Sequence, residues 1–206
     1  MPRDSTETRA RLAAAAERLF AAEGLYRVTN REIIEAAGQR NASALTYHFG
    51  SRDGLMVHIL GAHGVPLDEE RGDLAAGVGP DSSTHEVIRA LVEPYSGCLA
   101  TQSGRDYLRI VDQLRGRLSA WRRGAVSGDE HLQRLLSLVV ERPSGLDADL
   151  REQRLVSMMM LMTAAMAERA RLIEDGRPLV PGHDVFVANL TDMLVGIIHA
   201  PSAVVV

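Results

Sequence analysis

A helical spacing of apolar residues runs through almost the whole chain, and it restricts the possible folds more than any other feature of the sequence. In the stretch that ends at Leu99, for example, apolar residues recur three and four positions apart, which is the spacing of one buried helical face. Alternation of beta-branched residues, the signal of a strand, is confined to the tail Ala203–Val206. The sequence therefore predicts an all-α protein of about nine helices.

Length and composition indicate a globular chain outside the membrane. The 206 residues are 46% apolar and 24% charged, with a single cysteine, so a full core is possible and an internal disulfide is not. The longest apolar run, Leu155–Ala167, is too short to span a bilayer. Charged residues interrupt any apolar segment near the N-terminus. We expect a soluble, cytoplasmic protein with no membrane partner.

The net charge and the aromatic content argue against two ways of binding nucleic acid. The formal net charge is −4, which argues against non-specific coating of DNA or RNA. Aromatic residues make up only 4% of the chain, too few to build a stacking surface for single strands. All 23 basic residues are arginine, the side chain best suited to a bidentate phosphate contact.

Two short helices near the N-terminus have the proportions of a helix-turn-helix. Thr29 and Glu32 fit a capping box for a helix over residues 30–37, which Gly38 ends. Asn41 is the expected N-cap of a second helix, Ala42–His48. Its exposed side chains and those of the preceding turn are hydrogen-bonding groups that suit base edges and phosphates: Arg40, Asn41, Ser43, Thr46, Tyr47 and His48. From spacing alone, a polar surface hairpin remains an alternative.

The stretch Thr29–Leu55, TNREIIEAAGQRNASALTYHFGSRDGL, resembles the DNA-binding segment of the TetR family of transcriptional regulators. The helix caps, the glycine of the turn, the aromatic run and the start of the next helix all stand at the positions of the family's pattern. The resemblance covers about 50 N-terminal residues. Two departures affect the contacts. The turn Gly38–Asn41 is one residue longer than the common form, and Thr46 stands where many members have a tyrosine.

The resemblance implies a role for each matching residue. Contacts to the DNA backbone are implied for Thr29, through its hydroxyl and N–H, and for Tyr47, His48 and Arg52. Candidates for contacts to base edges are Arg40, Asn41, Ser43 and Thr46. Leu45 and Phe49 are expected to hold the recognition helix against the first helix.

We expect a DNA-binding domain at residues 1–50 and a ligand-binding and dimerisation domain at residues 51–206. A helix over about residues 51–63, capped by Ser51, would connect them. Five glycines and two prolines between Gly61 and Ser83 indicate a boundary there, and whether a helix over residues 67–76 continues the connecting helix stays open. The apolar helices at about residues 147–174 and 184–199 are expected to form a homodimer.

The resemblance also implies a small-molecule effector in the C-terminal part. Residues that combine apolar lining with polar tips are Tyr95, Tyr107, Trp121, Met159 and Met162, although plain core is the commoner role for each. The arginine pairs at residues 115 and 117 and at residues 122 and 123 are expected on solvated faces.

An enzyme is not expected. No two of the seven histidines stand three or four residues apart to share a metal, and neither a glycine-rich phosphate loop nor a Gly-x-Ser-x-Gly elbow is present. No cofactor is indicated. Cys98 is interpreted as a small core residue.

The sequence thus predicts a ligand-responsive homodimeric transcriptional regulator, a repressor of a near-palindromic operator. Two alternatives stay open: a helical small-molecule-binding module with a vestigial DNA-binding head, and a small all-α enzyme.

Overall fold

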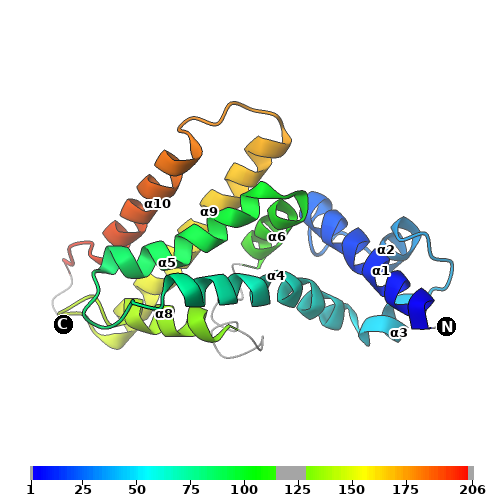
Figure 1. Ribbon diagram of the computed structural model, residues 1–206, viewed down its shortest axis with the longest axis horizontal. Helices are drawn as coiled ribbons and strands as arrows, with labels where there is room; N and C mark the ends of the chain where they lie inside the picture. The colour runs from blue at the N-terminus through cyan, green and yellow to red at the C-terminus, as the bar shows by residue number, and fades with distance from the viewer. Residues whose placement is uncertain (1, 115–128, 204–206) are drawn as a thin grey trace.

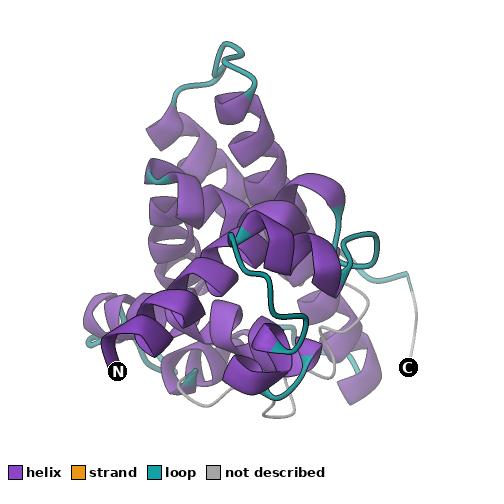
Figure 2. Cartoon of the chain, turned by 90° about the vertical axis from the view of Figure 1, so that its right-hand side faces the viewer, coloured by secondary structure: helices purple, strands orange, loops and turns teal. Residues whose placement is uncertain are grey.

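The protein is built from helices joined by short loops. The computed structural model describes residues 2–114 and 129–203, with side chains from Ser5 onward. Figure 2 shows no strand in these ranges, which confirms the all-α prediction. The elements are α1 (Pro2–Glu23), α2 (Asn30–Ala36), α3 (Ala44–Phe49), α4 (Arg52–Leu74), α5 (Thr84–Gly97), the 3₁₀ helix η1 (Cys98–Ala100), α6 (Gln102–Gln113), α8 (Glu130–Val140), α9 (Ala148–Glu174) and α10 (His183–Ile198).

The first three helices, which we call the head, lie at one end of the molecule (Figure 1). Their apolar faces meet around Phe20 of α1, Ile33 of α2 and Leu45 of α3, each at most 1% exposed. Leu55 of α4 lies in the same core. Because α2 and α3 are far too short to be stable alone, burial of these side chains is what holds them in place.

Helix α4 connects the head to the remaining helices, which we call the body. It starts at the predicted cap, where Ser51 Oγ accepts a hydrogen bond from Gly54 N at 2.9 Å. The predicted end near residue 63 is wrong, because the helix continues through Pro66 to Leu74. Packing explains the difference: Leu67 is buried, and burial of the helix beyond Pro66 outweighs the one hydrogen bond that a proline removes.

The second half of α4 is also fastened to α8. Asp68, 4% exposed, accepts hydrogen bonds from His131 N at 2.9 Å and from Leu132 N at 2.8 Å. These are orphan N–H groups of the first turn of α8, so the Asp68 carboxylate caps that helix from a neighbouring element. Continuity of α4 is therefore part of the body's structure.

The long helices α9 and α10 form a hairpin in the body, and the loop that joins them lies at the top of Figure 1. Their bounds agree within one residue with the predicted ranges. Leu155, Met158 and Met166 of α9 are fully buried, as are Leu190 and Leu194 of α10. None of the helices that the structure describes has an apolar stretch sufficient to span a membrane.

Candidate DNA-binding interface

The N-terminus of α2 forms the predicted capping box. Thr29 Oγ1 accepts a hydrogen bond from Glu32 N at 3.3 Å, and Thr29 N donates to Glu32 Oε2 at 2.7 Å. The Thr29 hydroxyl also donates to that carboxylate at 2.8 Å. These bonds from Thr29 lower the pKa of Glu32. The two groups of Thr29 that are expected to contact a phosphate are therefore bonded to a carboxylate in this structure.

The turn between α2 and α3 differs from the prediction. Gly38 has a φ of +68°, a conformation that favours glycine. Asn41 Oδ1 then accepts a hydrogen bond from Ser43 N at 2.9 Å, which forms an Asx turn. Helix α3 begins after this turn, at Ala44, with Ser43 as N-cap. The prediction that Asn41 caps a helix starting at Ala42 is therefore wrong, because its side chain stabilises the turn instead.

Helix α3 has one face buried in the head and one face exposed to solvent. Leu45 is 1% exposed, whereas Tyr47 is 78% exposed. His48 is half-buried and lies edge-on to Tyr47, with ring centroids 5.0 Å apart. Phe49, expected in the core, is half-buried between the Arg9 guanidinium and the His58 ring. The base-edge candidates are all exposed on the outer side of the turn and helix: Arg40, Asn41, Ser43 and Thr46.

Arg52, expected at a phosphate, bonds within the head. Its Nη2 donates to the carbonyl oxygens of Leu25 and Val28, both at 2.7 Å, and its Nη1 donates to Asn30 Oδ1 at 3.0 Å. The guanidinium carbon lies 4.7 Å from the centre of the Phe20 ring. Burial lowers the pKa of Arg52. These contacts connect the first residue of α4 to the loop before α2, a link that no local sequence signal indicates.

The head bears a second exposed aromatic side chain that the sequence reasoning missed. Tyr26, in the loop between α1 and α2, is 78% exposed, and Arg27 beside it is exposed as well. An aromatic next to an arginine in a loop that leads into a capped helix is the signal that would have found them.

Three of the predicted effector residues, Tyr95, Tyr107 and Met162, lie in the core of the body. Tyr95 and Tyr107 are buried, with ring centroids 6.4 Å apart. Burial raises the pKa of Tyr95 and raises that of Tyr107 to about 12. Met162 is buried and Met159 half-buried. Trp121 and the arginines at 115, 117, 122 and 123 lie outside the described residues.

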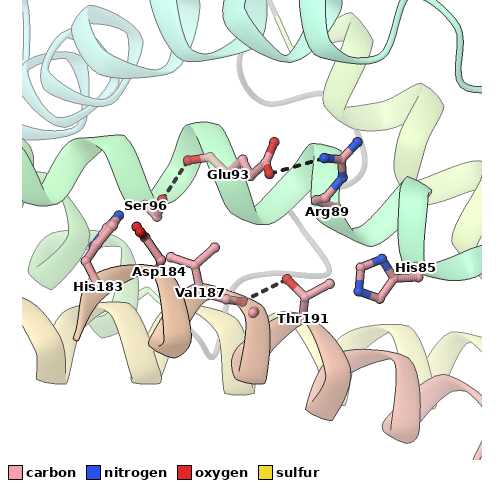
Figure 3. Close-up of a pocket in the computed structure, with 9 residues that line it drawn as sticks. His85, Arg89, Glu93, Ser96, His183, Asp184, Val187 and Thr191 are labelled. Atoms are coloured by element: carbon pink, nitrogen blue, oxygen red, sulfur yellow. Dashed lines mark hydrogen bonds and ion pairs between the residues drawn. The ribbon is translucent and has the colours of Figure 1, made fainter. Parts of the chain in front are cut away.

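A groove of about 410 Å³ lies elsewhere, between α5 and α10 (Figure 3). Its ionisable lining residues include His85, Arg89 and Glu93 of α5 and Asp184 of α10. None of the predicted effector residues lines it. His85, Arg89 and Glu93 stand four residues apart, so they lie on one face of α5. This spacing is the sequence signal that would have indicated the groove. Among the described residues, no cluster of three or more His, Cys, Asp or Glu could hold a metal ion.

The head and the whole fold both match known proteins. The model of the tetR family of bacterial regulatory proteins matches residues 12–59. NalD of Pseudomonas aeruginosa, the secondary repressor of the MexAB-OprM multidrug efflux pump, superposes with a TM-score of 0.60 at 16% identity, covering 94% of this chain and 96% of NalD. The probable transcriptional regulatory protein RHA5900 gives 0.53 at 18% identity, covering 94% and 100%.

At these identities the structural likeness shows the fold, and no curated protein is significantly similar to the chain in sequence. The family model covers the helices that carry the capping box, the turn and α3. The head is therefore similar in sequence to the tetR family of bacterial regulatory proteins, and the chain shares its fold with NalD and RHA5900 over nearly its full length.

Proposed function

We propose that this chain is a homodimeric repressor that inserts α3 of each protomer into the major groove of a near-palindromic operator. The observation that carries the proposal is α3 itself, in which Leu45 is buried whereas Thr46 and Tyr47 are exposed. A twofold dimer would bind two half-sites about 34–36 Å apart, one helical turn of DNA.

The contacts divide into two kinds. Arg40, Asn41, Ser43 and Thr46 are proposed to contact base edges, because their side chains are exposed on and next to α3. Thr29, Tyr47 and His48 are proposed to contact phosphates and fix the orientation of the helix. Both kinds are needed, since phosphate contacts supply affinity and base contacts supply sequence preference.

Dimerisation is proposed through α9 and α10. Met160 of α9 is 42% exposed, and Val185 and Met193 of α10 are 61% and 44% exposed. Apolar side chains exposed together on one hairpin are typical of a helical interface. Met193→Arg should therefore yield a monomer in analytical ultracentrifugation. The matched control is Val57→Arg, at an equally exposed position on α4, which should leave the dimer intact.

An effector is proposed to bind in the body near Tyr95, Tyr107, Met159 and Met162, the last two supplying adaptable apolar contacts. The Tyr95 hydroxyl supports this site, because it is buried and has no hydrogen-bond partner among the described residues. An unpartnered buried hydroxyl costs about 1–3 kcal/mol, which a ligand acceptor would recover. Such a ligand would release DNA only through its preference for one conformation, about 1–3 kcal/mol.

Repression is proposed because NalD, which shares the fold, is a repressor. The test is a reporter gene placed behind a duplex that the protein selects from a random pool. Expression should fall when the unsubstituted chain is produced and recover with Arg40→Ala. A rise in expression would indicate an activator, and no binding to any duplex would favour a helical binding module with a vestigial head.

A further inference from the structure

The loop between α1 and α2 is folded around the Arg52 guanidinium. The carbonyl oxygens of Leu25 and Val28 both accept hydrogen bonds from Nη2, at 2.7 Å. Together with the bond from Nη1 to Asn30 Oδ1 at 3.0 Å, they use three of the five N–H donors of the side chain. Stacking on Phe20 covers one face of the guanidinium. Three donors of the half-buried Arg52 are thus bonded to the head itself.

The two residues between these carbonyls point outward. Tyr26 is 78% exposed, and the exposed Arg27 side chain has no hydrogen bond or ion pair among the described residues. Arg27 also lies within electrostatic reach of Glu32, since its charge contributes to the lowered pKa of that carboxyl. The loop therefore presents an unpaired cation beside the capping box of α2.

A phosphate bound at Thr29 would lie next to the carboxylate of the capping box. Glu32 Oε2 lies 2.8 Å from the Thr29 hydroxyl, so a phosphate that approached Thr29 would meet a carboxylate. Two anions at such close range repel each other unless a positive charge stands between them or beside them. Arg27 is placed to supply this charge and to donate two parallel hydrogen bonds to the phosphate.

We propose that Arg27 provides the cationic contact to the DNA backbone beside Thr29, and that Arg52 is a positioning residue that holds the loop from which Arg27 projects. The inference rests on the proposed DNA-binding function. It assigns a contact with the DNA backbone to Arg27, which lies outside the helix-turn-helix. It assigns a different role, that of holding the loop by hydrogen bonds, to Arg52.

The salt dependence of DNA binding tests this division of roles. A mixed-sequence duplex of about 30 base pairs, about three helical turns, is a suitable probe because phosphate contacts do not depend on sequence. Arg27→Ala should reduce the slope of log K against log salt by about 0.9, the value for one lost phosphate contact. The melting temperature of the protein should change little, because the Arg27 side chain makes no hydrogen bond or ion pair among the described residues.

Arg18→Ala is the matched control. Arg18 is an exposed arginine of the same domain, but it lies on the side of α1 that faces Ser103 and Asp106 of α6. Its removal changes the net charge by the same amount and should leave the slope and the melting temperature unaltered.

Arg52→Lys separates positioning from phosphate binding. A lysine ammonium can replace a point charge at a phosphate, but it cannot donate to Leu25 O, Val28 O and Asn30 Oδ1 in the geometry of a guanidinium. We expect a lower melting temperature, weaker binding and an unchanged salt slope below that temperature. A lysine variant with normal binding and stability, or an Arg27→Ala variant with an unchanged slope, would overturn the inference. No binding by the unsubstituted chain would instead refute the proposed function on which the inference rests.

Discussion

Glu17 of α1 and His63 of α4 are joined at 2.9 Å between Oε1 and Nε2, where the head meets the body. Ser103 of α6 donates to the same carboxylate oxygen at 2.6 Å. The His63 ring stacks on Tyr107, one of the predicted effector residues, with ring centroids 4.7 Å apart. The His63 ring therefore connects Glu17 of the head to Tyr107 of the proposed effector site.

Glu17→Ala should weaken the junction between head and body. Its side chain is 14% exposed, and its removal leaves His63 and Ser103 without their shared acceptor. We expect the free energy of unfolding to fall by about 1–3 kcal/mol, measured by urea denaturation. Glu23→Ala, on the same helix at an exposed position, should change it by less than about 0.5 kcal/mol. Equal effects would show that the junction contributes nothing.

Leu45→Ala should destabilise the head. The side chain is 1% exposed, and removing it leaves a cavity in the core of the head that costs about 2–5 kcal/mol. Because α3 is too short to fold alone, DNA affinity should fall together with stability. Thr46→Ala, the exposed neighbour, should keep the melting temperature within a few degrees. A stable Leu45→Ala head would contradict the packing described for α3.

Cys98 should react slowly with alkylating reagents. Burial raises the pKa of its thiol to about 11, from the ordinary 9.0, so at pH 8 the reactive thiolate is about 100-fold rarer than for a free cysteine. Iodoacetamide labelling should accelerate as the pH rises, and in urea it should reach the rate of an unfolded peptide. Equal rates in folded and unfolded protein at pH 8 would show that the thiol is exposed.

Stability should decline at alkaline pH. Burial raises the pKa of Tyr107 from 10.0 to about 12, and it also raises the pKa of Tyr95. A group whose pKa is raised on folding stabilises the fold fully below its unfolded pKa, and this contribution is lost as the pH rises through the folded pKa. The chain has no lysine, so few other groups titrate there. The urea midpoint should fall between about pH 10 and 12, and less steeply in Tyr107→Phe.

Local signals predicted the parts of the fold that depend on neighbouring residues. The Thr29 capping box and the Ser51 cap each depend on only four consecutive positions, and the structure confirms both. The start of α3 was predicted wrongly because Asn41 has two competing uses, as a helix cap and in a turn, and the longer turn favours the second. The residues around Asn41 are compatible with both uses, so the sequence alone does not distinguish them.

Features that depend on distant contacts were beyond the sequence. Helix α4 passes through Pro66 because Asp68 caps α8 and Leu67 is buried, and neither partner is visible from the prolines and glycines of that stretch. The bonds of Arg52 join residues 22 to 27 positions apart. The family resemblance assigns it a phosphate, whereas this loop geometry uses the same donors inside the protein.

Selection of bound duplexes from a random pool at about 150 mM salt, near the physiological value, tests the central claim most directly. The unsubstituted chain should enrich a near-palindromic motif with half-sites about 34–36 Å apart. Arg40→Ala, run in parallel, should enrich the same motif with a relaxed preference of about 1–3 kcal/mol at one base pair in each half. Failure of the folded, dimeric protein to enrich any motif would contradict the account.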